Sequence, residues 1–122
     1  MSTTYIESNL SEEAGNVHKA IASLTEELEA VDWYNQRADK APDAELKSIL
    51  LHNRNEEIEH ASMLLEWLRR NIPDFDGTLR TYLFKTAPIT QIEEAATGEG
   101  GGAEDAAGSS ASGSLGIGKL SK

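Results

Sequence analysis

The sequence contains no cysteine, which excludes disulfide bonds, thiolate metal sites and thiol catalysis. It also lacks a long apolar run, since no segment approaches the roughly 20 apolar residues of a transmembrane helix. Residues 1–15 do not show the basic and then apolar pattern of a secretory signal peptide. There is no Gly-rich phosphate loop and no nucleophile elbow. We therefore expect a cytoplasmic protein that does not cross a membrane.

Positive charge is scarce as well. The 122 residues include 11 Lys and Arg against 21 Asp and Glu, which gives a formal net charge of −10. This balance disfavours binding to nucleic acid or to an anionic membrane, and it favours the attraction of cations. The length is sufficient for one small domain.

Hydrophobic periodicity predicts two long helices. Ser11 is a suitable N-cap for the first, whose apolar residues recur at steps of four and three, as in the seam of a helical bundle. They are Leu10, Ala14, Val17, Ile21, Leu24, Leu28 and Val31. Pro42 ends this helix, and the second runs from about Asp43 to Arg70 before Pro73 stops it. Because the connection is short, the two helices are expected to form an antiparallel hairpin.

Weaker periodicity follows the hairpin. A third, shorter helix is predicted over residues 76–85, and a last turn or two after Pro88. Residues 1–10 are expected to be a flexible leader. The whole of 11–95 is expected to form one helical domain, so the fold class is all-α, a hairpin plus a short C-terminal helix.

The composition changes sharply after this domain. Residues 96–112 are rich in Gly, Ala and Ser, which is typical of a flexible linker. Residues 113–122 then carry three regularly placed large apolar side chains. Disordered tails seldom keep such side chains unless a partner binds them, so we expect the tail to dock on another protein.

A candidate metal site lies on the two long helices. Glu57 and His60 are three residues apart and share a helix face, and their side chains are of the types that bind first-row transition metals. Glu27 lies three residues after Leu24 and four before Val31, on the apolar stripe. A buried, unpaired carboxylate is costly, and a divalent cation removes that cost. The pattern predicts half of a metal site, the alternative being a polar network that sets helix register.

One hairpin cannot enclose these side chains, because two amphipathic helices leave an apolar face open. A homodimer with two-fold symmetry would form a four-helix bundle and bring two half-sites together. Two copies each of Glu27, Glu57 and His60 would then supply ligands for two metals. Carboxylates with one imidazole per metal favour iron or manganese over copper, and zinc would also fit.

A second stripe on the first helix consists of Glu26, Glu29 and Trp33. It is interpreted either as a solvated acidic face with a half-buried Trp or as an attractor for cations beside the metal site. Tyr34 lies seven residues after Glu27, on the same stripe as that ligand. Tyr34 is expected either to pack at a subunit interface or to form a hydrogen bond near the ligands.

Several segments resemble the encapsulated ferritins. The first helix resembles theirs in EELEAVDWY at 26–34 and QRAD at 36–39, the second in HNRNEEIEHA at 52–61, and the next segment in RTYLF at 80–84. The likeness covers about residues 11–95 and includes both ligand-bearing helices. The tail, GSLGIG at 113–118, resembles the peptide that docks such cargo inside an encapsulin shell, although Lys119 stands where a small polar residue is more usual.

The resemblance implies a dimer that carries a ferroxidase centre and assembles further into an annular decamer. It implies that Glu27, Glu57 and His60 bind a di-iron pair shared between two subunits, with Tyr34 nearby. It also implies that the stripe of Glu26, Glu29 and Trp33 is the site where metal enters.

Three functional hypotheses follow. The first is a ferroxidase that oxidises Fe(II) to Fe(III) and delivers iron for storage inside an encapsulin nanocompartment. The second is a carrier that binds divalent metal without turnover. The third is a structural helical bundle whose polar seam sets register and whose tail targets a partner.

Overall fold

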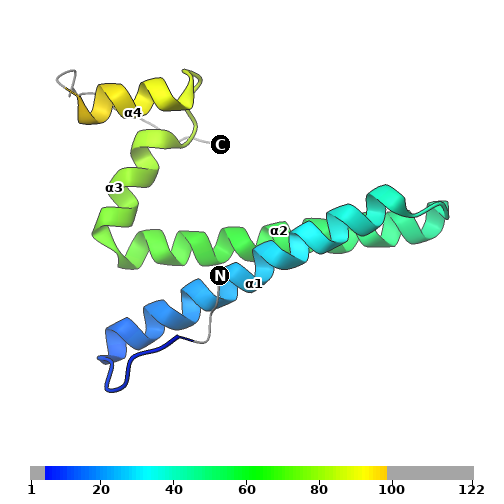
Figure 1. Cartoon of the computed structure of the whole chain (residues 1–122), viewed down its shortest axis with the longest axis horizontal. Helices are drawn as coiled ribbons and strands as arrows, with labels where there is room; N and C mark the ends of the chain where they lie inside the picture. Colours follow the sequence, from blue (N-terminus) through cyan, green and yellow to red (C-terminus); the bar gives the residue numbers. More distant parts are fainter. Residues whose placement is uncertain (1–4, 99–122) are drawn as a thin grey trace. The chain divides into compact units, whose positions relative to one another are not determined.

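The computed structural model of the chain describes residues 5–98 (Figure 1). The described part contains four helices and no strand: α1 (Glu12–Lys40), α2 (Ala44–Asn71), α3 (Pro73–Tyr82) and α4 (Ile89–Thr97). The first two pack against each other as an antiparallel hairpin. These features confirm the predicted all-α class and the hairpin.

Side-chain caps set the starts of the two long helices. The Ser11 hydroxyl accepts a hydrogen bond from the backbone N–H of Ala14 at 3.1 Å. The carboxylate of Asp43 accepts one from the N–H of Leu46 at 2.9 Å. Each cap satisfies a donor that has no partner inside its helix. Pro42 lies in the three-residue connection between Lys40 and Ala44, so the turn is as short as its spacing predicts.

The later helices differ from the sequence prediction. α3 begins at Pro73, because proline suits the first position of a helix, where its missing N–H has no cost. It ends before Phe84, which has a left-handed φ of 60° that a continuing helix does not allow. α4 is a nine-residue helix instead of a turn or two, and it continues to Thr97.

The chain divides into two compact units after Phe75. The first unit contains α1 and α2, and it carries all the side chains predicted to bind or attract metal. The leader residues 5–10 have no regular secondary structure, whereas most of the predicted linker and the whole predicted docking tail lie outside the described residues. None of the helices within residues 5–98 is long and apolar enough to cross a membrane.

The core of the hairpin is very small. In the described chain its buried apolar residues are Ala20, Ala38, Ala61 and Leu68. Three of the four are alanines, whose small side chains let the two helix backbones approach closely. Within residues 5–98, only Leu68, which is 1% exposed, is a large and fully buried side chain. A core of this size supplies little apolar burial for two helices of 29 and 28 residues.

The apolar stripe predicted on α1 is only partly covered in the single chain. Val17, Leu24 and Val31 are partly buried, whereas Ile21 and Leu28 are 45% and 54% exposed. The reason is geometric, because one partner helix covers a narrow strip and the stripe is wider than that strip. The uncovered half is available to a second hairpin.

Candidate metal centre

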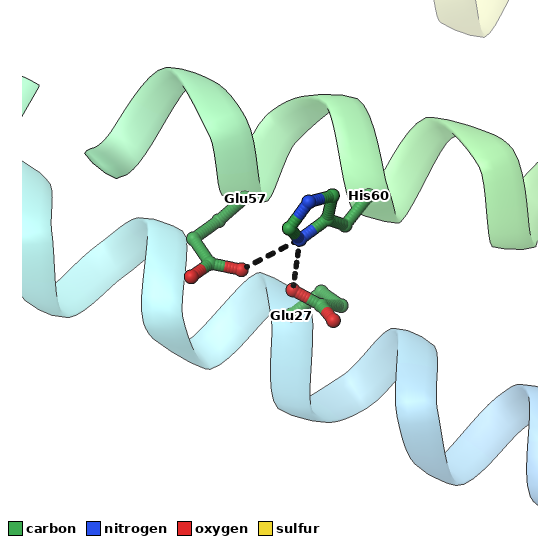
Figure 2. Close-up of side chains that lie close together, drawn as sticks. All are labelled: Glu27, Glu57 and His60. Atoms are coloured by element: carbon green, nitrogen blue, oxygen red, sulfur yellow. Dashed lines mark hydrogen bonds and ion pairs between the residues drawn. The ribbon is translucent and has the colours of Figure 1, made fainter. Parts of the chain in front are cut away.

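Glu27, Glu57 and His60 converge where α1 and α2 face each other (Figure 2). The Nδ1 atom of His60 lies 3.3 Å from Oε1 of Glu57 and 3.5 Å from Oε1 of Glu27. Glu57 and His60 are one turn apart on α2, and Glu27 reaches them from α1. One ligand atom from each residue lies within 4.8 Å of the other two. Within residues 5–98 this is the one such group of three or more potential ligands.

These distances suit coordination of one cation. Two ligands at right angles around a first-row metal, each about 2.1 Å from it, are about 3 Å apart. The two His60 distances are close to that value, so small side-chain rotations would place the three atoms around an ion. The carboxylate side chains are 26% and 23% exposed, and the imidazole is 45% exposed. The ring is therefore open on one side, where further ligands can reach the ion.

Electrostatics also favour a cation at this point. A hydrogen bond with the Glu57 carboxyl, desolvation and the Glu57 charge raise the pKa of Glu27, and the opposing effect of His60 is smaller. Desolvation works to lower the pKa of His60, but the hydrogen bond with Glu57 and the charges of both carboxylates raise it overall. Two carboxylates in contact are costly to ionise together, and a divalent ion compensates for their charge.

Comparison with known proteins places this chain in a family. The chain matches the EncFtn-like family over residues 2–86, which include both helices of the hairpin. The chain belongs to the EncFtn-like family. This membership confirms the resemblance to encapsulated ferritins noted from the sequence.

Individual relatives agree with the family match. The chain is 60% identical over 114 residues to an encapsulated ferritin-like protein of Rhodospirillum rubrum, covering 91% of this chain and 81% of that one. It is 54% identical over 102 residues to a ferritin-like protein of Thermotoga maritima, covering 84% and 82%. Its fold is similar to the crystal structure of a Nitrosomonas europaea protein, with a TM-score of 0.68, 58% identity, and coverage of 70% of this chain and 97% of that one.

The remaining predicted site residues of this EncFtn-like chain lie on α1. Glu26, Glu29 and Trp33 are all exposed, which suits either a solvated face or a cation attractor. Tyr34 is partly buried, and the Arg37 guanidinium carbon lies 5.6 Å from the centre of its ring. This is within the range of a cation–π contact. The roles predicted for these side chains stay predictions.

Two polar clusters were not anticipated from the sequence. Near the end of α2, Arg69 and Arg70 contact the Glu66 carboxylate at 2.8 and 2.7 Å and lower the pKa of Glu66 to about 2. Their spacings of three and four residues are typical of helix ion pairs and would have identified them. The second cluster joins Arg54 of α2 to Asn35 of α1, and no local spacing rule predicts a pair so far apart in sequence.

Proposed function

We propose that this protein is a ferroxidase whose di-iron centre forms across a homodimer interface. The observation that carries the proposal is the convergence of Glu27, Glu57 and His60 at the contact between α1 and α2. Three ligands from one chain leave positions open in the coordination shell of iron. A second copy related by a two-fold axis would add an identical set.

The exposed apolar side chains of the hairpin support dimerisation. Leu28 and Ile58 directly follow Glu27 and Glu57 in sequence, and they are 54% and 44% exposed in the single chain. Exposed large apolar side chains next to partly buried carboxylates are typical of a surface that a partner covers. Pairing two hairpins would form a four-helix bundle, bury these side chains and bring the two half-sites together.

Iron is proposed as the substrate from the ligand types and from the family. Two carboxylates and one imidazole suit iron, and relatives are described as ferritin-like and as encapsulated ferritin-like. The net charge of −10 attracts Fe(II), and the exposed Glu26 and Glu29 carboxylates beside Trp33 would guide it to the site. Each Fe(II) would lose one electron to dioxygen or peroxide. Tyr34 is proposed to lie near the site of this oxidation. The ligand carboxylates would stabilise the added positive charge of Fe(III).

Oxidation in the presence of excess Fe(II) tests the proposal against the alternatives. A ferroxidase is expected to continue oxidising iron well beyond one metal per ligand set, because the site is regenerated after each turnover. The measurement is a progress curve of Fe(III) formation at a large excess of Fe(II), with the metal content per subunit and the native mass of the same sample. A curve that stops at the binding stoichiometry would indicate a carrier. Absence of metal uptake would indicate a structural bundle.

The tail carries a separate part of the proposal. We propose that residues 113–122 dock the protein, as an annular decamer, inside an encapsulin shell in the cytoplasm. The support is the apolar pattern of this segment and the name of the Rhodospirillum rubrum relative. Deleting residues 113–122 is expected to abolish co-purification with a co-expressed shell protein while the oxidation rate is unchanged. Retained co-purification would assign docking to another part of the chain.

A further inference from the structure

Arg54 connects the two helices of the hairpin close to the metal ligands. Its Nη1 atom donates a hydrogen bond of 2.9 Å to Oδ1 of Asn35 on α1. Its Nε and Nη2 atoms donate hydrogen bonds of 3.2 and 3.0 Å to Oδ1 of the neighbouring Asn55. The guanidinium is thus oriented by one helix and bonded to the other. Arg54 itself is partly buried.

The three-residue turn sets the relative height of α1 and α2 only approximately, so a directional contact is needed to fix it more finely. Ala20, Ala38 and Ala61 form most of the core of the hairpin, and small side chains bury little apolar area that would favour one register over another. A slip of one residue moves one helix by about 1.5 Å along the other. The Nδ1 atom of His60 lies only 3.3 and 3.5 Å from the carboxylate oxygens of Glu57 and Glu27. A shift of that size would therefore separate the ligands of α1 from those of α2.

The position of Arg54 makes it suited to this task. It lies three residues before Glu57, so both side chains project from adjacent turns of α2. A contact that holds Arg54 to Asn35 therefore holds Glu57 in register with α1, which carries Glu27. Displacement of a reacting group by about 1 Å can cost up to two orders of magnitude in rate.

We propose that Arg54 is a positioning residue, which through Asn35 holds the register of α1 and α2 that brings Glu27 to Glu57 and His60. This inference deepens the proposed function and rests on it for its catalytic consequence. Its consequence for metal binding can be measured without turnover.

The experiment compares four single variants of the full chain and one double variant, which combines Arg54→Met with Asn35→Ala. Arg54→Met removes the donors and keeps the length of the side chain, and Asn35→Ala removes the acceptor on α1. Asn55→Ala is the matched control, because it removes the acceptor within α2 and leaves the contact between helices. Arg54→Lys retains one donor for Asn35. Binding of Co(II) by calorimetry, its visible absorption bands and the kcat and KM of Fe(II) oxidation are measured, with circular dichroism to verify helix content.

Arg54→Met and Asn35→Ala are each expected to weaken Co(II) binding by about tenfold, alter its absorption bands and reduce kcat/KM for Fe(II) by a similar factor. The double variant is expected to be no worse than Arg54→Met alone, since both changes remove one contact. Asn55→Ala is expected to weaken Co(II) binding and reduce kcat/KM less than Asn35→Ala does. Arg54→Lys is expected to have a Co(II) affinity and a kcat/KM between those of Arg54→Met and the unchanged protein.

Several results would overturn the inference. One is a wild-type Co(II) affinity and spectrum in Arg54→Met, even if its melting temperature falls, because the contact would then only stabilise the fold. Another is a loss of Co(II) affinity in Asn55→Ala as large as the loss in Asn35→Ala. Failure of the unchanged protein to turn over Fe(II) would reject the proposed function and leave the Co(II) comparison valid. If the unchanged protein bound no Co(II), the proposed function and the role of Arg54 would both be rejected.

Discussion

Replacing Glu27 with alanine is expected to reduce the rate of Fe(II) oxidation by about 100-fold or more, while the hairpin remains folded. Glu27 is the one member of the converging group that α1 supplies. Without it, each chain retains only Glu57 and His60, and the metal loses a carboxylate that balances the charge of Fe(III). The same loss is expected for Glu27→Gln, which preserves size but removes the charge.

The metal-free variant is not expected to be less stable than the parent protein. Contact with the Glu57 carboxyl raises the pKa of Glu27 in the folded chain. A carboxyl whose pKa is raised by folding destabilises the fold at pH values above its unfolded pKa, where the unfolded chain ionises it freely. Removing Glu27 therefore relieves a cost at neutral pH, and the free energy of unfolding should be unchanged or higher.

Initial oxidation rates and urea unfolding curves, measured on the same metal-free preparations, test both expectations. Glu59→Ala is the matched control, because Glu59 is an exposed carboxylate on α2 next to His60 and is outside the converging group. It is expected to oxidise Fe(II) at the parent rate. Normal oxidation by a folded Glu27→Ala protein would exclude this cluster as the centre.

Local rules account for what the sequence predicted well. Ser11 and Asp43 are caps that act on the backbone N–H three residues ahead, so both long helices could be placed within about a residue. Pro42 sets the turn between them in the same local way. The convergence of Glu27 with Glu57 and His60 was predictable because helical periodicity puts each on the contact face, and the short turn fixes their approximate height.

Other parts of the fold and of the site could not be predicted, because residue spacing does not determine them. The most deeply buried residues of α2 are Ala61 and Leu68, so the centre of its contact face is offset by one residue from the predicted ligand His60. That offset arises from the rotation of each helix about its axis, which packing of both helices decides together. The contact between Arg54 and Asn35 depends on side-chain conformations and on tertiary proximity. Phe84 ended α3 through its own backbone conformation, although its residue type does not favour a left-handed φ.

Dimerisation is the step on which the proposed chemistry depends most, and Leu28→Asp is expected to abolish it. Leu28 is 54% exposed in the single chain, so a charge there should alter the stability of an isolated hairpin by only about 0.5 kcal/mol. In a dimer that covers this side chain, the same carboxylate would be buried beside Glu27 without a partner, at a cost of several kcal/mol. A single substitution should therefore separate pairing from folding.

The native mass of Leu28→Asp, measured with its helix content and its rate of Fe(II) oxidation, tests this expectation. We expect a folded monomer with little oxidation activity, because each chain alone offers three ligands for one ion. Leu28→Met is the matched control, since it keeps an apolar side chain of similar volume and should remain dimeric and active. A Leu28→Asp dimer with normal oxidation would place the interface elsewhere. A monomer with normal oxidation would mean that one hairpin holds the complete centre.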